Sequence, residues 1–441
     1  MISKTMKLLT ALLILVHSKS WSQTLPALNK EMRTDITDSL VSALLNNYVY
    51  PEKAKSMSFY IKSQLGKGAY DTLINPDHFA NIVTNDVRSI YPDKHLIIRY
   101  DPGLEKRIMA FNNTNKIDSV DIKREQKQNF FFKKAEILPG NTGYIVFTNF
   151  ADTNQWSRKT VRTAMQFVAY TDALILDLRN NFGGNATMAG EIISYFYNQP
   201  TFTGRAYNRI TNTWTEQWAD NKPAITTGIY MSMPLYILTS ERTFSAAEGL
   251  AYNLQQIKKA IIIGDTTRGG AHATRSFALG HGFVGFIPFT RSENAITKTD
   301  WEDRGVIPDI AVNEDSALLK AQEQIYLEDL SKAKGDEEKN KFKWLINDLK
   351  TKTLKLVIPA SALKQYTGQY EEFVFTLRKK ELYCTNTHQK AKTDKLTPIT
   401  TTLFKIDEQS QVEFIKDDKG KFSGIKLYWN DGWVDSIKKN K

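Results

Sequence analysis

Ser245 stands where an apolar run passes into a helix, a place where a serine can act as a nucleophile. Residues 234–239 predict a buried strand, and residues 246–258 have the pattern of a helix. A serine at a helix start lies in positive electrostatic potential, and the amide of Ala246 could stabilise an oxyanion there. The same residues form the pattern Ser245-x-x-Glu248 of a capping box, which is the more frequent role of such a serine.

The glycine pair Gly183-Gly184 could supply a second oxyanion donor. It follows the run 173–178, which predicts a strand buried on both faces, and precedes a helix predicted over residues 186–197. Glycines let the backbone approach another group closely, and amides at a helix start can hold developing negative charge. An ordinary strand-to-helix turn has the same pattern, so the turn indicates an oxyanion donor only in combination with Ser245.

A serine nucleophile needs a base, and two histidines are placed to supply one. His95 lies at the junction between an N-terminal helical segment and the first strand of the core, and junction loops often carry catalytic groups. His272 follows the strand that comes after the Ser245 helix, and either histidine could reach the serine. Glu302, in a loop near the end of the core, could orient the base. A surface carboxylate is an equally frequent role for such a glutamate.

The sequence lacks the motifs of metal, nucleotide-cofactor and nucleic-acid binding. There is no His-x-x-x-His, and the only cysteine, Cys384, leaves no cysteine cluster and no intrachain disulfide. We expect Cys384 to be a small core residue. Phosphate-loop and dinucleotide fingerprints are absent, so we expect no metal and no cofactor. The net charge is +11, but no nucleic-acid motif accompanies it, and we expect no nucleic-acid partner.

The elements that must position these residues fall into segments that differ in predicted secondary structure. A length of 441 residues suggests several domains. The expected order is a helical subdomain (27–95), a core that alternates strands and helices (96–314), a charged helical linker (315–354) and a small antiparallel β domain (355–441). Helices are predicted over 52–65 and 77–90. The alternation in the core predicts an α/β protein.

The first 22 residues are predicted to be a signal peptide. They combine a positively charged start, an apolar run over residues 8–16, and the small residues Ser20 and Ser22 before a cut at Gln23. The expected location is therefore the periplasm or the medium. No later stretch is long and apolar enough to suggest a membrane span.

Four motifs, taken in order, resemble those of the S41 peptidase family, in the branch with tail-specific, tricorn-core and interphotoreceptor retinoid-binding-protein-like members. They are Asp93-Lys94-His95-Leu96, the turn 177–184, Thr243-Phe244-Ser245-Ala246-Ala247-Glu248 and Gly305-Val306-Ile307-Pro308-Asp309. The resemblance covers about residues 30–312. It implies a crotonase-like core of stacked ββα units. The predicted helical subdomain precedes this core, and the predicted β domain follows it.

The resemblance also implies a serine-type endopeptidase that hydrolyses peptide bonds in peptides or in unfolded protein C-terminal tails. Ser245 would be the nucleophile, with an oxyanion hole made by the amides of Ala246 and of Gly183 or Gly184. Tail-specific members use a lysine as base, and that position is Gly270 here. Tricorn-like members use a histidine and an acid that match His95 and Glu302. His272 stays an alternative base.

Two departures from the family pattern leave other functions open. Lys94 stands where tricorn-type enzymes place a serine, and residues 96–140 are too short for the PDZ domain that many members carry. One alternative is a weakly active or inactive binding protein of the same fold that holds an apolar ligand or a peptide. Another makes the C-terminal β domain the functional part, as a partner- or glycan-binding module.

Overall fold

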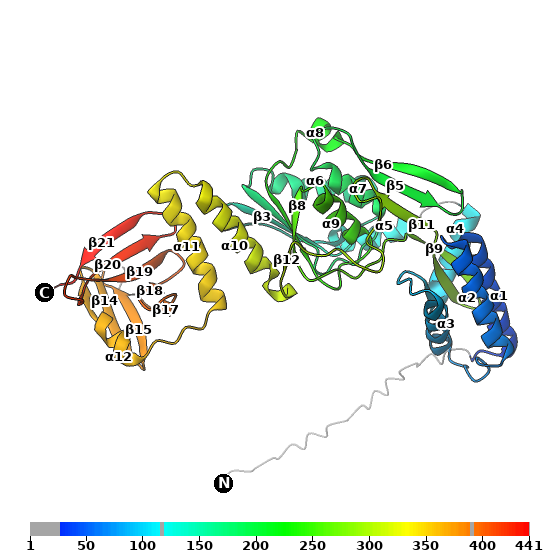
Figure 1. The fold of residues 1–441 in the computed structure, drawn as a ribbon, viewed down its shortest axis with the longest axis horizontal. Helices are drawn as coiled ribbons and strands as arrows, with labels where there is room; N and C mark the ends of the chain where they lie inside the picture. The colour runs from blue at the N-terminus through cyan, green and yellow to red at the C-terminus, as the bar shows by residue number, and fades with distance from the viewer. Residues whose placement is uncertain (1–26, 115–118, 389–391, 441) are drawn as a thin grey trace, which may run out of the picture.

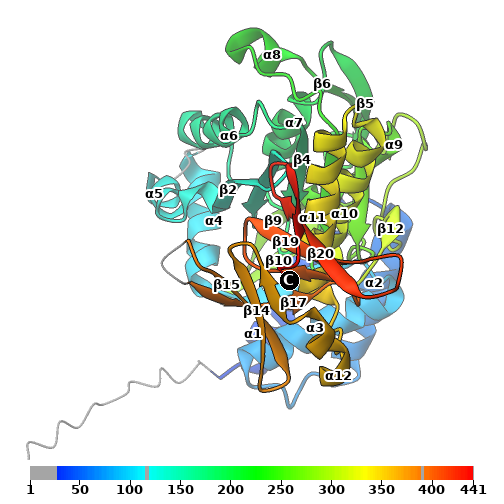
Figure 2. The ribbon, with the colours of Figure 1, turned by 90° about the vertical axis from the view of Figure 1, so that its left-hand side faces the viewer.

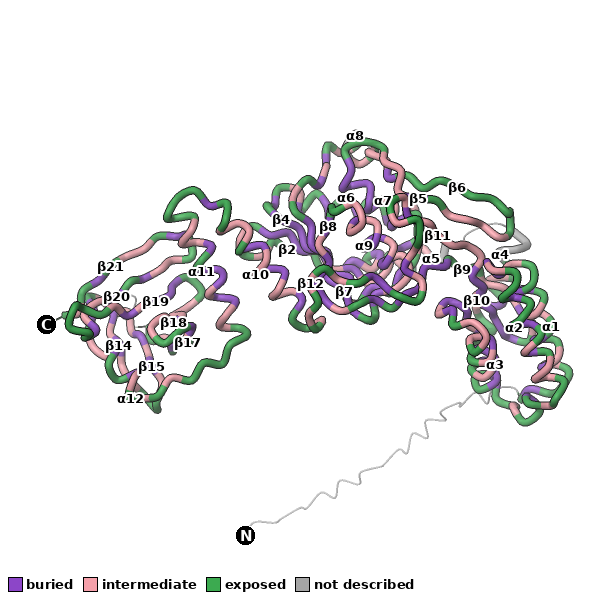
Figure 3. The backbone as a smooth tube through the Cα atoms, viewed as in Figure 1, coloured by how far each residue is buried: buried purple, intermediate pink, exposed green. Residues whose placement is uncertain are grey.

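The computed structural model describes residues 27–114, 119–388 and 392–440, so the predicted signal peptide lies outside the described residues. The molecule is elongated, with the N-terminal helices at one end and the C-terminal strands at the other (Figure 1). Buried residues gather along the strands between these ends (Figure 3). Within the described ranges, no helix is both long and apolar enough to cross a membrane.

The N-terminal segment is built from three helices, α1 (Lys30–Asn47), α2 (Pro51–Gly66) and α3 (Pro76–Ile90). Prolines open α2 and α3, where their missing N–H costs no hydrogen bond. The helices share one apolar core with a three-stranded sheet in the order β1-β10-β9. Its strands are β1 (Ile97–Tyr100), β9 (Thr274–Gly280) and β10 (Phe283–Pro288). Segments distant in sequence therefore meet around the loop that carries His95.

A six-stranded sheet in the order β12-β8-β7-β4-β3-β2 forms the centre of the core. Its strands are β2 (Phe132–Leu138), β3 (Thr142–Phe147), β4 (Ala173–Asp177), β7 (Leu235–Thr239), β8 (Ala260–Gly264) and β12 (Ile310–Ala311). All neighbours are parallel except β2, which pairs antiparallel with β3. Every residue of β4 and β7 is buried, as the apolar runs predicted.

Helices cover both faces of this sheet. The helices α6 (Gln155–Phe167), α7 (Ala186–Ser194) and α9 (Ala246–Gln256) share one apolar cluster with Leu174 and Leu176 of β4. The helices α10 (Glu314–Lys332) and α11 (Asp336–Thr353) share another with Ile175. Because successive residues of a strand point to opposite faces, these clusters lie on opposite sides of the sheet. The α/β class is confirmed, whereas the crotonase-like assignment and the domain boundaries stay predictions.

Several elements had no counterpart in the sequence analysis. The polar stretch after β1 forms α4 (Pro102–Thr114), α5 (Ser119–Lys127) and a short 3-10 turn (Asn129–Phe131). A separate sheet joins β5 (Thr201–Asn208), β6 (Thr213–Ala219) and β11 (Thr290–Asn294) in the order β11-β5-β6, and the short helix α8 (Lys222–Thr227) follows β6. Six of the seven residues of β6 are exposed. The strand therefore has no buried face, and its sequence lacks the regular alternation of apolar and polar residues that predicts a half-buried strand.

The C-terminal segment consists of two antiparallel sheets around one aromatic cluster. After α12 (Ala360–Leu363) and a 3-10 turn (Lys364–Tyr366), the first sheet contains β13 (Gly368–Tyr370), β14 (Phe373–Arg378), β15 (Glu381–Asn386) and β16 (Thr393–Lys395). The second contains β17 (Thr397–Pro398), β18 (Leu403–Lys405), β19 (Ser410–Lys416), β20 (Phe422–Trp429) and β21 (Val434–Lys438). Viewed from this end, the strands lie in front of α10 and α11 (Figure 2). Cys384 is buried in the cluster, and burial raises the pKa of its thiol to about 12, which confirms its expected core role.

Candidate active site

Ser245 lies at the start of α9 with a backbone conformation that residues with side chains rarely adopt. Its φ is 55° and its ψ is −118°. Such strained positions persist only when the surrounding structure fixes them, and they concentrate at functional sites. The serine's N–H donates to Glu248 Oε2 at 2.7 Å, which is the glutamate's half of the capping box expected from the sequence.

Glu248 binds the loop that follows β8 as well as the first residue of the helix. Its carboxylate also accepts hydrogen bonds from the hydroxyl of Thr267 and from the amides of Gly269 and Gly270. Burial raises the pKa of this carboxyl, while these donors act in the opposite direction. One buried carboxylate therefore joins the backbone of Ser245 to the loop that follows β8.

The glycine turn after β4 lies directly against the serine. A Cβ on Gly183 would stand 2.8 Å from Cβ of Ser245 and 3.1 Å from the amide nitrogen of Ala246. The Gly183 amide donates to Asn181 Oδ1 at 2.9 Å. The amides of Gly184 and Ala246 have no acceptor among the residues that the structure describes. Of the three amides named from the sequence, these two therefore have no acceptor among the described residues.

His95 reaches the serine's immediate neighbour. Its ring stacks on Phe244, with ring centroids 4.3 Å apart and an interplanar angle of 24°. Its backbone N–H donates to Asp93 Oδ1 at 2.9 Å, and neither ring nitrogen has a partner among the described residues. Burial lowers the pKa of His95 to about 4, against the opposing charge of Asp93. The imidazole is therefore neutral at physiological pH.

Gly270 makes room for this stacked pair. A Cβ at this position would stand 2.3 Å from Cε2 of Phe244 and 2.6 Å from Cε1 of His95. Gly270 stands where the resemblance places the lysine base of the tail-specific peptidases. In this chain, the ring of His95 fills the space next to that position.

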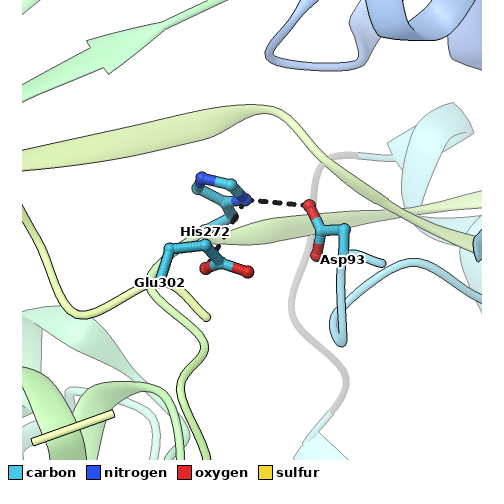
Figure 4. A group of neighbouring side chains, drawn as sticks. All are labelled: Asp93, His272 and Glu302. Atoms are coloured by element: carbon cyan, nitrogen blue, oxygen red, sulfur yellow. Dashed lines mark hydrogen bonds and ion pairs between the residues drawn. The ribbon is translucent and has the colours of Figure 1, made fainter. Parts of the chain in front are cut away.

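His272 is fully buried and belongs to a different group of side chains, with Asp93 and Glu302 (Figure 4). Its Nδ1 lies 2.8 Å from Asp93 Oδ2, and its Nε2 lies 3.5 Å from the hydroxyl of Tyr50. The hydroxyl of Tyr48 donates to the same Asp93 oxygen at 2.9 Å. Burial alone would lower the pKa of His272, but the hydrogen bond and charge of Asp93 raise it above the ordinary value.

Glu302 lies with His272, and not in hydrogen-bond contact with His95. Its Oε2 lies 3.6 Å from His272 Nδ1 and accepts a hydrogen bond from the Ala271 amide, while its Oε1 has no partner within the described residues. Burial raises the pKa of Glu302 to about 7, against the opposing charge of His272. The preceding Trp301 packs its ring on Gly249 of α9 and donates from Nε1 to the Gly270 carbonyl.

The structure therefore distributes the residues named from the sequence over two adjoining groups. Ser245, the glycine turn and His95 meet around Phe244, whereas Glu302 and His272 meet around Asp93. No hydrogen bond joins His95 to Ser245 or Glu302 in the described part of the chain, because both ring nitrogens are unpartnered. The Ser245–His95–Glu302 triad stays a prediction.

Asp93, His272 and Glu302 are also the residues that could hold a cation. Each offers one ligand atom, and these atoms lie within 4.8 Å of one another. Asp93 was named from the sequence only as part of a motif and received no role there. The three ligand-bearing residues are too far apart in sequence to form a recognisable metal-binding spacing.

Lys94, which stands where tricorn-type enzymes have a serine, bonds to the loop that follows β8. Its ammonium donates to the carbonyl of Arg268. The guanidinium of Arg268 in turn lies 5.0 Å from the ring centroid of Phe244, within the range of a cation–π contact. Lys94 therefore stabilises the position of the loop that follows β8 through this hydrogen bond.

Comparison with known proteins gives matches to the core of the chain. The model of peptidase family S41 matches residues 141–312. The chloroplastic carboxyl-terminal-processing peptidase 2 of Arabidopsis thaliana is 31% identical over 184 residues, which are 39% of this chain and 33% of that protein. The matching segment thus spans about a third of this relative.

Solved structures also resemble the chain. One is a putative peptidase from Parabacteroides merdae, with 17% identity and a TM-score of 0.45 over 64% of this chain and 90% of that one. Another is the photosystem II D1 C-terminal processing protease, with 15% identity and a TM-score of 0.41 over 64% of this chain and 94% of that one.

Proposed function

We propose that this chain, whose residues 141–312 belong to peptidase family S41, is a serine-type endopeptidase with Ser245 as its nucleophile. The observation that carries the proposal is the backbone of Ser245, which has a φ of 55° at the start of a helix, with Gly183 packed against it. Strain of this kind is retained where it positions a reacting group.

The proposed hydrolysis uses the groups of the site that have no partner among the described residues. Ser245 attacks the peptide carbonyl, and the neutral imidazole of His95 accepts the serine proton and then returns it to the leaving amine. The unpaired amides of Gly184 and Ala246 donate to the oxygen that gains negative charge. The stacking of His95 on Phe244, the residue that precedes Ser245, supports its role as the base.

His272 is the alternative base, supported by its bond to Asp93. A carboxylate that binds Nδ1 leaves Nε2 as the proton acceptor, which is how a histidine is oriented in catalytic triads. In this arrangement Glu302, at 3.6 Å from Nδ1, adds a second negative charge behind the ring. The pH dependence described in the Discussion distinguishes the two histidines.

The proposed substrates are peptides or unfolded protein tails. Family membership supports a peptide substrate, and the name of the Arabidopsis relative points to processing at carboxyl ends. The sequence of residues 1–22 supports action in the periplasm or the medium.

A binding protein of the same fold is the second candidate, favoured by the absence of a hydrogen bond to either ring nitrogen of His95. A fluorophosphonate probe separates the two candidates, because it modifies a serine only where a base and an oxyanion hole activate it. We expect the label on Ser245 by peptide mapping. It should be absent in Ser245→Ala and unchanged in Ser56→Ala, which alters an exposed serine of α2. An unlabelled but folded wild-type protein would favour the binding protein.

A further inference from the structure

A series of hydrogen bonds holds the backbone of Ser245 and that of His95 through two carboxylates. Oε2 of Glu248 accepts from the amides of Ser245 and Gly270, at 2.7 and 3.0 Å. Oδ1 of Asp93 accepts from the amide of His95 at 2.9 Å. Each carboxylate therefore fixes the backbone of one residue of the proposed site. The contacts between the two loops then set how these residues lie relative to each other.

His272 supplies the buried contact between the two loops. It follows Gly270 by two positions in the loop after β8, and its Nδ1 lies 2.8 Å from Oδ2 of Asp93 (Figure 4). A carboxylate oxygen accepts hydrogen bonds, so Nδ1 carries the proton of this contact. Asp93 and His272 are both 0% exposed, and a hydrogen bond shielded from water is stronger than an exposed one. The pair therefore fixes the loop after β8 to the loop of His95.

The two histidines differ in what surrounds their ring nitrogens. Nε2 of His272 lies 3.5 Å from the hydroxyl of Tyr50, and the two rings pack edge-on with centroids 5.4 Å apart. Both nitrogens of His272 thus face protein groups. Neither ring nitrogen of His95 has a partner among the described residues. A base needs a nitrogen that is free to accept a proton, so the surroundings of His95 suit a base and those of His272 suit a fixed contact.

Other contacts of the His95 loop leave this role to the pair of Asp93 and His272. Arg88 of α3 donates to the carbonyls of Asp93 and Lys94 at 3.2 and 2.7 Å, which holds the loop to the helix. The bond from Lys94 to the carbonyl of Arg268 also reaches the loop after β8, but it is exposed to water. Water competes for exposed donors and acceptors, so the buried pair contributes more to the relative position of the loops.

We propose that His272 is a positioning residue, which sets the place of His95 relative to Ser245 through Asp93. The inference rests on the proposed function, in which His95 is the base. Without the His272 donor, Oδ2 of Asp93 keeps only the hydroxyl of Tyr48 and loses its bond to the loop after β8. The amide of His95 follows this carboxylate, and a small displacement of a base has a large effect on rate.

The test compares two amide substitutions of His272 in the full chain. In His272→Asn the amide nitrogen can take the place of Nδ1 and donate to Asp93, whereas His272→Gln carries its amide toward the place of Nε2. We expect the fluorophosphonate reaction of Ser245 to slow about a hundredfold in His272→Gln and to return to within about tenfold of wild type in His272→Asn. The loss should fall on kinact, the rate constant at saturating probe, and leave KI unchanged.

The matched control is His281→Gln, the same substitution in an exposed histidine that pairs with Asp35 at 3.0 Å, outside the site. It should leave kinact unchanged. A second readout does not depend on catalysis: hydrogen–deuterium exchange of the peptide with residues 93–96 reports on the amide of His95. This amide should exchange faster in His272→Gln than in wild type, and His272→Asn should restore its protection.

The outcomes separate this inference from the proposed function. Equal kinact in His272→Gln and wild type would overturn the inference and leave the proposed function standing. Loss of labelling in His272→Asn as complete as in His95→Ala would assign His272 as a base, and this comparison decides even if His272→Gln does not fold. A wild-type protein without label on Ser245 would contradict the proposed function. In that case, exchange at residues 93–96 that is the same in all three proteins would overturn the inference as well.

Discussion

His95 stacks on Phe244, with ring centroids 4.3 Å apart, and Phe244 directly precedes Ser245 in the chain. The stack is possible because position 270 is a glycine, since a Cβ there would overlap both rings. The identity of this one residue thus bears on where the proposed base lies relative to the proposed nucleophile.

Gly270→Ala should therefore displace the His95 ring. We expect the fluorophosphonate reaction of Ser245 to slow on the order of a hundredfold, because small misplacements of a catalytic group have effects of this size. Overpacking should also destabilise the fold by about 1–3 kcal/mol. Gly190→Ala is the matched control, since a Cβ at that helix position meets nothing within 4 Å. Equal labelling rates in the two variants would show that the stack has no role.

The pH dependence of labelling identifies the base. A base must be unprotonated to act, and burial lowers the pKa of His95 to about 4. If His95 is the base, the labelling rate stays level from neutral pH downward and falls only as the pH approaches about 4. The pKa of His272 is instead raised above 6.5, so with His272 as base the rate declines already above pH 6.5. Rates measured across this range, with His95→Ala and His272→Ala as comparisons, decide between them.

Glu302 should make stability depend on pH. Burial raises its pKa from 4.5 to about 7, so its contribution is fully present below pH 4.5 and is lost as the pH rises through about 7. Glu302→Gln removes this loss. We expect its advantage in unfolding free energy over the wild type to grow by about 1–3 kcal/mol between these pH values.

Urea unfolding below pH 4.5 and above pH 7 measures this change. Asp303→Asn is the control, because Asp303 is the neighbouring acid and is exposed. A difference between Glu302→Gln and wild type that does not vary with pH would mean that folding leaves the pKa of Glu302 unchanged.

The proposed export signal predicts the start of the mature chain. Protein recovered from the periplasm or the medium should begin at Gln23, as measured by intact mass. Ser22→Tyr places a bulky side chain before the cut and should leave the precursor uncleaved. A mature chain that retains residues 1–22 in the wild type would contradict the assignment.

The sequence predicted those features whose signals are local. The apolar runs of β4 and β7 and the position of Ser245 before a helix can be read from neighbouring residues. The pairing of Asp93 with His272 could not be found in this way, because it depends on how segments distant in sequence meet. Glu302 was assigned to His95 by resemblance, and its contact with His272 arises from the Ala271 amide that holds it.

The shared core of the N-terminal helices with β9 and β10 has a consequence for biosynthesis. The helices emerge from the ribosome first, but their apolar faces are covered only when residues 274–288 have been made. The loop with Asp93 and His95 lies at that junction, so the proposed site is assembled only after these later residues are made. If the proposed peptidase activity is correct, a nascent chain would lack it while its earlier part is still unfolded and open to cleavage.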